Sequence, residues 1–343
     1  MTELPSLSLL EKLCNACAVS GDEGAVRQIV LEEIRTHADE INVDAIGNVL
    51  AVKHGQGDAP RKRVMVTAHM DEVGFMLIDK GKDGLFRFDI AGGIDVRVLP
   101  GKAVWVGKER TPGVIGARPI HLTSASERSR AMSVDELRID VGPQGKANAG
   151  DWAVFATSFE QIGPSLRAKA LDDRLGVAIL ITLLKNAPAN IDLLAAFTVQ
   201  EEVGLRGAEA AAHTLNPDLA IAVDCTPAYD QPSWDDEENT QYNTRLGYGP
   251  AIYVADRRTI SNPALVRHFT AVAEAEKIPY QYRQPGGGST DAGGIFHRRT
   301  GIPVISLSTP GRYLHTPLSI ARLDDWHNTY RLLHAALGRM NAE

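Results

Sequence analysis

Continuously apolar stretches alternate with amphipathic stretches in the first and last parts of the chain. Residues 64–68 (VMVTA) are apolar or β-branched, which is typical of a strand buried on both faces. Ser20 and Glu23 stand at capping-box spacing ahead of a helical pattern. From residue 165 onward the alternation returns, with predicted strands at 193–199, 219–223 and 303–308 and predicted helices at 172–186, 207–215, 262–277 and from about 322.

The middle of the chain has a different pattern. Between about residues 75 and 164, short strand-like pieces are separated by glycine, proline and polar turns, which is typical of a compact β-rich unit. The simplest architecture is a discontinuous α/β domain, formed by residues 1–72 and 165–343, that carries an inserted β-rich domain at residues 73–164. The alternation of strands and helices predicts a mostly parallel central sheet.

Side chains that can bind metal follow the predicted strands: His69 and Asp71 after the first, Glu201 and Glu202 after the second, Asp224 after the third and His315 after the fourth. Asp172 and Asp173 stand at the start of a predicted helix, where the helix dipole favours carboxylates. In open α/β sheets, ligands bind beyond the carboxyl ends of the strands, so parallel strands bring these residues together. The spacing alone does not rank Asp172 above Asp173, or Glu201 above Glu202.

These residue types predict a site for borderline divalent metals. Two histidines and several carboxylates suit zinc, cobalt or manganese. If two ions share one carboxylate, and each also binds one histidine and one further carboxylate, a bridging hydroxide brings the charge to zero. One carboxylate is then left over beside the water. We therefore expect one of Glu201 and Glu202 to bind metal and the other to transfer protons.

Composition and charge argue against several other classes of protein. The formal net charge is −7 and no stretch is strongly basic, which argues against a nucleic-acid partner. No apolar run approaches the ~20 residues that span a bilayer, and the first residues do not resemble a signal peptide, so we expect a cytoplasmic protein. Cys14 and Cys17 form a C-x-x-C inside an apolar helical pattern, and we interpret them as packing residues instead of a zinc or redox pair.

Several motifs give the chain a resemblance to a known family. In order along the chain they are AHMDEVGFML, ALDDRLG, QEEVGLRGA, AVDCTPA, GGGSTDAGG and PGRYLHTP. Their order and spacing are similar to those of the tetrahedral-type (TET) metallo-aminopeptidases, family forty-two of the metallopeptidases, which are related to glutamyl, leucyl and deblocking aminopeptidases. The resemblance runs nearly from end to end and includes VSGDEGAVR and DAIGNVLAV near the start.

The resemblance implies an activity and a role for each residue of the site. The implied enzyme removes the N-terminal residue of peptides through a water shared by two divalent ions, with zinc or cobalt expected first and manganese next. The implied metal ligands are His69, Asp172 (shared by both ions), Glu202, Asp224 and His315. Glu201 matches the general base, and Asp71 matches the carboxylate that fixes the ring of His69.

The resemblance also implies a fold and partners. It implies a zinc-peptidase-like α/β/α sandwich with a PDZ-like or barrel-like inserted domain, used to assemble dimers and then a homo-oligomer as large as a dodecamer. The implied partners are peptides with a free N-terminus. The loop 230–244 departs from the family pattern. Its acids Asp235, Asp236, Glu237 and Glu238 could favour basic N-terminal residues, although a solvated loop explains them more simply.

Two other functions are compatible with the same residue types. A dinuclear metal hydrolase that acts on another amide, such as an N-acyl amino acid, would use the same ligands. A non-catalytic scaffold on a peptidase fold would be expected to lack a ligand or the base, and here all five ligand positions and Glu201 are present. The motifs therefore favour the aminopeptidase.

Overall fold

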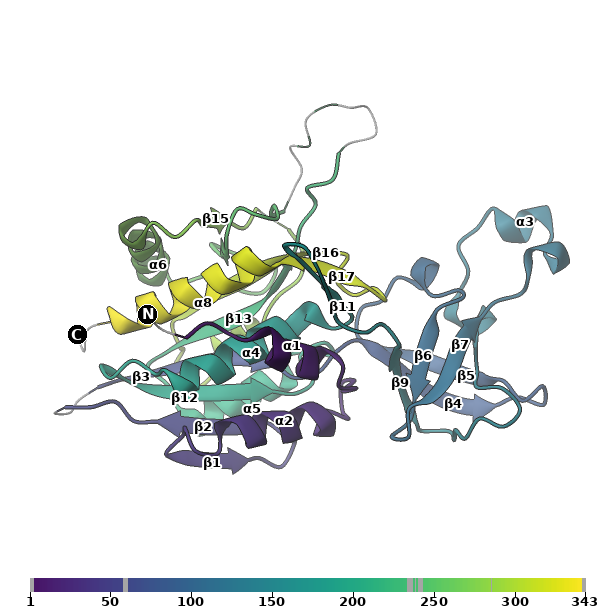
Figure 1. The fold of residues 1–343 in the computed structure, drawn as a ribbon, viewed down its shortest axis with the longest axis horizontal. Coiled ribbons are helices and arrows are strands. Elements are labelled where there is room, and N and C mark those ends of the chain that lie inside the picture. The colour runs from purple at the N-terminus through teal and green to yellow at the C-terminus, as the bar shows by residue number, and fades with distance from the viewer. Residues whose placement is uncertain are drawn as a thin grey trace.

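The computed structural model describes residues 3–57, 61–232, 237, 239, 243–284 and 286–340. It has two bodies, a large sheet covered by helices and a small β-rich body at one end of it (Figure 1). The functional residues predicted from the sequence belong to the large body.

Among the described residues, the large body is built on an eleven-stranded mixed sheet. Nine of its strands lie in the order β1 (Glu40–Val43), β2 (Val49–Lys53), β12 (Ile191–Thr198), β3 (Lys62–His69), β13 (Leu219–Pro227), β16 (Val304–Arg312), β17 (Ser319–Arg322), β11 (Ser165–Ala168) and β10 (Glu160–Ile162). The other two are β14 (Ala251–Ile252), which pairs with β16, and β15 (Gln281–Tyr282), which pairs with β14.

The four central strands β12, β3, β13 and β16 run parallel to one another. They are almost continuously apolar because helices cover both of their faces. Most of the flanking strands pair antiparallel, and outside the centre only the short pair β14 and β15 is parallel among the described residues. The predicted α/β architecture with a separate β-rich unit is confirmed. The parallel centre matters for function because it points four carboxyl ends at one edge.

Helices cover both faces of the sheet. One face carries α1 (Leu7–Cys14), α2 (Gly24–Ile34), α4 (Leu171–Lys185), α6 (Pro263–Glu276) and α8 (Leu323–Gly338), which share one apolar core with the strands. The other face carries α5 (Arg206–Leu215) and the short α7 (Ala292–Ile295), which pack on alanine-rich strands. Cys14 is buried in the first core as a free thiol, in agreement with its predicted packing role. In the described part of the chain, no helix combines the length and apolarity needed to cross a bilayer.

The small body is a closed six-stranded barrel made of β4 (Gly74–Lys80), β5 (Phe86–Ala91), β6 (Ala103–Val106), β7 (Thr111–Gly116), β8 (Arg138–Asp140) and β9 (Trp152–Phe155). Its connections contain α3 (Ala125–Arg128) and the 3₁₀ turns η1 (Val96–Val98), η2 (Ile120–Leu122) and η3 (Val134–Glu136). The barrel has its own core, in which Phe75 packs edge-to-face against Phe88 and Phe155 with ring centres 5.2 Å apart. The large sheet resumes at Glu160.

The predicted capping box at Ser20 and Glu23 is wrong. Helix α2 begins at Gly24, and Glu23 makes no capping hydrogen bond with its side chain. Glu23 Oε1 instead accepts a hydrogen bond from Gly21 N (2.6 Å), and Ser20 Oγ donates to Asp71 Oδ2 (2.6 Å). The serine hydroxyl therefore bonds to Asp71 at the edge of the sheet, and it does not cap the start of α2.

Candidate active site

The residues predicted to bind metal converge at the carboxyl edge of the parallel strands. His69 ends β3 and Asp224 lies in β13. The other members follow β12, begin α4 or follow β16, and they are Glu201, Glu202, Asp172 and His315. All of these except Glu202 line one cavity of about 500 Å³. Glu202 lines a smaller adjoining cavity together with Asp172 and His315.

Asp172 lies between the two histidines. Its Oδ1 is 3.2 Å from Nε2 of His69, and its Oδ2 is 3.5 Å from Nε2 of His315. Within the described ranges, Asp172 is the only carboxylate that makes ion pairs with both histidines. This geometry fits the shared ligand of two ions.

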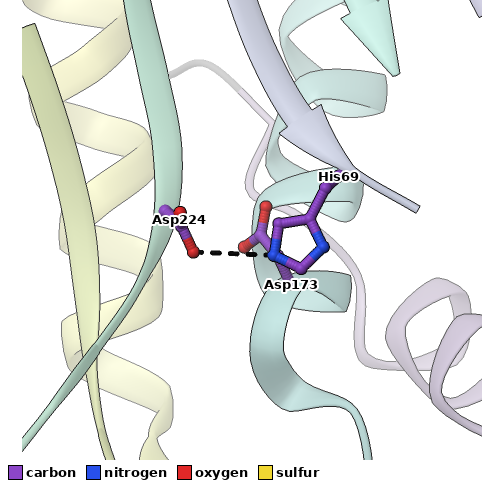
Figure 2. A group of neighbouring side chains, drawn as sticks. All are labelled: His69, Asp173 and Asp224. Carbon is purple, nitrogen blue, oxygen red and sulfur yellow. Dashed lines mark ion pairs between the residues drawn. The ribbon is translucent and has the colours of Figure 1, made fainter. Parts of the chain in front are cut away.

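Each histidine also has a carboxylate partner of its own. Asp224 Oδ1 is 3.8 Å from His69 Nε2, and Glu202 Oε1 is 3.3 Å from His315 Nε2. Figure 2 shows His69 facing Asp224 across the site, with Asp173 beside them. Asp173 has a carboxylate oxygen close enough to join a metal group with His69 and Asp224. Its Oδ1, however, accepts a hydrogen bond from Gly176 N (3.0 Å), so it also helps to shape the start of α4.

The adjacent acids Glu201 and Glu202 have different surroundings. Glu202 pairs with His315, whereas Glu201 faces the larger cavity. Glu201 belongs to none of the potential metal groups found among the described residues. The two adjacent acids, which the sequence could not rank, therefore lie in different environments: Glu202 beside His315 and Glu201 at the wall of the larger cavity.

Asp71 contacts both the turn that carries these acids and the ring of His69. It is fully buried, and its carboxylate accepts hydrogen bonds from the backbone N–H groups of Glu201 (3.0 Å) and Glu202 (3.2 Å). His69 Nδ1 is within hydrogen-bond distance of the Asp71 backbone oxygen (3.1 Å), and the carboxylate Oδ1 lies farther away, at 3.6 Å. Ser20 completes this arrangement through its 2.6 Å hydrogen bond, and sequence reasoning missed that role because a capping box looked sufficient. An oxygen of this kind at Nδ1, from a backbone carbonyl or a carboxylate, orients a histidine whose Nε2 binds metal.

The segment after β5 of the barrel contributes to the site. The Gly93 carbonyl oxygen is 2.9 Å from His315 Nδ1, so the ring can donate there and present Nε2 to Asp172. The preceding Gly92 has φ of +89°. A Cβ at Gly92 would lie 2.7 Å from Val73 Cγ1 and 3.3 Å from Glu202 Cβ. Glycine thus allows the barrel segment to approach the metal-binding edge.

Burial governs the protonation of these carboxylates in the protein alone. It raises the pKa of Glu202 and of Asp224 to about 7; the histidines oppose this shift and the Asp172 charge adds to it. Burial also raises the pKa of Glu201 well above its usual range, against the charge of His69 and with the charge of Asp224. For His315, burial lowers the pKa, but the neighbouring carboxylates more than offset this and raise it to about 10. The buried carboxylates at the carboxyl edge of the sheet therefore outnumber the positively charged side chains beside them.

The residues at this edge fit two divalent cations. The carboxylates outnumber the two histidines, and they are Asp172, Asp173, Glu201, Glu202 and Asp224. In the described part of the chain, the buried Oδ2 of Asp173 has no hydrogen-bond partner. Buried like charges at this density are unfavourable unless cations neutralise them. The combination of imidazole and carboxylate ligands suits zinc, cobalt or manganese.

The sequence did not identify the wall of the cavity. Arg283, Tyr253 and the glycines 286–288 line the cavity together with the catalytic candidates. Asp291, from the same glycine-rich motif, is buried and accepts a hydrogen bond from Thr198 Oγ1 (2.6 Å), which ties this loop to the end of β12. A charged residue three positions ahead of a glycine run was the available signal, but loops of this kind usually carry solvated charges.

Comparisons with known proteins agree with this geometry. The family model described as M42 glutamyl aminopeptidase matches residues 47–332. The chain is 32% identical over 343 residues to a lysyl aminopeptidase of Pyrococcus furiosus, with 96% of each protein covered. It is also similar to the solved structure of aminopeptidase APDkam598 from Desulfurococcus kamchatkensis, at 34% identity and a TM-score of 0.91, with 98% of this chain and 95% of that chain covered.

A further solved structure is the Pyrococcus horikoshii TET1 peptidase, which can assemble into a tetrahedron or a large octahedral shell. It has 32% identity and a TM-score of 0.85, with 97% of this chain and 99% of that chain covered. The family model covers most of the chain, and the relatives match it from end to end. The chain therefore belongs to the M42 glutamyl aminopeptidase family, and it is a metal-dependent aminopeptidase.

Proposed function

We propose that the carboxyl edge of the parallel strands is the active site of this aminopeptidase. His69, Asp172 and Asp224 would hold one divalent ion, and Asp172, Glu202 and His315 would hold the other. The observation that carries this assignment is the position of Asp172, whose two oxygens face Nε2 of the two histidines at 3.2 and 3.5 Å. Zinc or cobalt are the metals that the donor set favours, and manganese is the next choice.

Glu201 is the proposed general base. When bound, the two ions would acidify the attacking water and polarise the scissile carbonyl. Glu201 faces the same cavity without pairing with either histidine, so its carboxylate is free to accept a proton from the water and return it to the leaving amine. The raised pKa of Glu201 in the protein alone would fall once cations are bound nearby. Asp71 would act as a positioning residue, since it holds the Glu201 turn and the ring of His69.

The substrate is proposed to be a peptide with a free N-terminus. The cavity is open to solvent beside several carboxylates, which would favour a protonated α-amine and select against a blocked one. This limits cleavage to the first peptide bond.

The barrel, within the proposed inserted domain 73–164, is assigned to assembly. The P. horikoshii relative can assemble into a tetrahedron or a large octahedral shell, and its structure matches nearly the whole chain. We propose that this protein likewise forms dimers and a larger homo-oligomer, as large as a dodecamer. Sedimentation of the full chain, with a barrel-surface variant as comparison, measures this directly.

The function is tested with a chelated sample that is loaded again with zinc or cobalt. The sample is offered a panel of aminoacyl-p-nitroanilides, each beside its N-acetylated counterpart. The proposal predicts metal-dependent cleavage of the free-amine substrates only. Cleavage of the acetylated substrates would contradict it and indicate a broader amidohydrolase.

A further inference from the structure

One wall of the active-site cavity is formed by two short strands that extend the sheet beyond β16. β14 pairs with β16, and Tyr253, which follows β14, donates its backbone N–H to Ser306 O (3.1 Å). β15 pairs with β14, and Arg283, which follows β15, donates its backbone N–H to Ile252 O (3.0 Å). These registers place Tyr253 and Arg283 side by side. Both side chains line the cavity that also contains the metal-binding candidates.

Arg283 is a buried cation that makes no ion pair among the described residues, although its charge reaches Asp256, where burial raises the pKa of the carboxyl and Arg283 opposes that rise. The residue is only 6% exposed, and its guanidinium lies over the ring of Tyr253 with Cζ 4.6 Å from the ring centre. Nη2 donates to Gly287 O, whereas Nε and Nη1 have no hydrogen-bond partner among the residues that the structure describes. In the part of the chain that the structure describes, no carboxylate makes an ion pair with Arg283, and stacking on Tyr253 offsets only part of its desolvation.

The glycine-rich loop leaves room in front of this guanidinium. A Cβ at Gly287 would meet no atom within 4 Å, and one at Gly286 would be 3.6 Å from Arg283 Nη2. Asn243, on the same wall, has a buried Oδ1 without a hydrogen-bond partner among the described residues. The wall therefore presents unused polar groups, dominated by a full positive charge, to the space where a substrate side chain would lie.

We propose that Arg283 binds the side-chain carboxylate of an acidic N-terminal residue, so that the enzyme prefers glutamate or aspartate at that position. This inference rests on the proposed function, because it places the substrate's α-amine and scissile bond at the Asp172 edge of the same cavity. A carboxylate is the ligand that supplies both a counter-charge and acceptors to an arginine with unused donors. The family alone does not decide the side chain, since one relative is a lysyl aminopeptidase.

The acidic loop at residues 230–244 leads to the opposite prediction for the preferred N-terminal residue of the substrate. Its acids would favour basic N-terminal residues, but Asp235, Asp236 and Glu238 lie outside the described residues and Glu237 is exposed. Arg283, by contrast, is buried and lines the cavity itself. A comparison of glutamyl and lysyl substrates separates the two hypotheses, since each predicts a different preferred substrate.

The test measures kcat/KM for the p-nitroanilides of glutamate, leucine and lysine with the metal-loaded full chain. Wild type is expected to prefer glutamate, and Arg283→Met is expected to lower the glutamate-to-leucine ratio roughly 10- to 100-fold, because a hydrogen bond to a charged group is lost. Arg283→Lys should fall between the two. Arg245→Met is the matched control, because Arg245 also lies over a tyrosine ring (5.7 Å from Tyr248) but does not line the cavity.

A second carboxylate source is distinguished with dipeptides. If Arg283 bound the C-terminal carboxylate of a dipeptide, Arg283→Met would weaken cleavage of Leu-Gly relative to Leu-Gly amide and leave the glutamate-to-leucine ratio unchanged. That result, or an equal loss on all substrates, would overturn the proposal. So would a wild-type preference for lysine.

Binding of free glutamate and glutamine, measured by calorimetry, tests the inference without turnover. Both ligands carry the same α-carboxylate, so a difference between them reports the side chain. Wild type should bind glutamate more tightly, and Arg283→Met should remove the difference. Equal binding by wild type would refute the role of Arg283. An absence of cleavage together with tighter glutamate binding would instead refute only the proposed function.

Discussion

The cluster around Asp172 and the adjoining cluster around Glu72 both bury charged side chains, but only the second supplies enough cations of its own for its carboxylate. Glu72 receives Lys169 Nζ at 2.7 and 2.9 Å and Arg174 Nη2 at 3.1 Å, and none of these side chains is more than 3% exposed. Lys169 Nζ also donates to Ala16 O (2.8 Å). In this cluster two cations surround one carboxylate.

The cluster around Asp172 has the opposite balance. Its carboxylates outnumber its histidines, and burial raises the pKa of Glu202 and Asp224 to about 7. The two clusters touch, since Glu72, Lys169, Asp172 and Glu202 line the same small cavity. The comparison teaches that buried charge by itself does not mark a functional site. A cluster of buried carboxylates with too few cations does mark such a site, because a cation from outside the chain must supply the missing charge.

The largest expected effect comes from removing the carboxylate between the histidines. Asp172→Ala should lose bound metal and reduce peptide cleavage to background, because both ions lose a ligand. Metal content by atomic spectroscopy and turnover of an aminoacyl-p-nitroanilide measure the two losses. Asp173→Asn, which can still accept the hydrogen bond from Gly176 N, is the matched control and should keep both ions. A fully loaded Asp172→Ala protein would place the shared ligand elsewhere.

Breaking the ion pairs of Glu72 should lower the stability of the fold and leave metal binding unchanged. Glu72→Gln leaves Lys169 and Arg174 buried beside a neutral amide, which should lower the free energy of unfolding by about 3–5 kcal/mol. Denaturant unfolding measures the change, and the metal content should stay near that of wild type. Glu32→Gln breaks the exposed Lys12–Glu32 pair and should change stability little. Equal stability of Glu72→Gln and Glu32→Gln would contradict the comparison.

A smaller effect is expected from pH on chelated protein. The raised pKa of Glu202 and Asp224 means that the folded chain keeps protons that the unfolded chain releases between about pH 4 and 7. The stability of chelated protein should therefore fall as pH rises through this window. Metal-loaded protein should not lose stability in this way over the same pH range, because bound cations then take the place of the protons on Glu202 and Asp224. Melting temperatures of both forms at pH 5 and 7.5 test this, and parallel curves would contradict it.

Much of the edge could be predicted from the sequence because most of its residues stand at the end of, or shortly after, the apolar run of a buried strand. His69, Asp224 and the pair Glu201 and Glu202 stand after continuously apolar runs, and the parallel pairing of those runs brings them together. The ranking of Glu201 and Glu202 could not be read locally. It depends on which side chain reaches His315, a residue more than a hundred positions away.

Contacts between distant segments account for what the sequence did not reveal. Ser20 had a plausible local partner in Glu23, but its hydroxyl bonds to Asp71, 51 positions away. In the sequence, Arg283 resembles an ordinary solvated residue of a loop. Its position over the ring of Tyr253 follows from the pairing of β14 with β15, which the sequence does not reveal. The barrel segments were predicted as strands, but the order β4-β5-β8-β7-β6-β9 cannot be derived from their apolar alternation.

The most direct test of the central claim is the metal content and turnover of Glu201→Gln, measured on the same sample. The claim is that five side chains hold two ions while Glu201 remains uncoordinated and transfers the proton. It predicts about two ions per chain, as in wild type, with turnover reduced roughly 10²- to 10⁴-fold. Turnover at the wild-type rate, or a loss of metal in this variant, would contradict it.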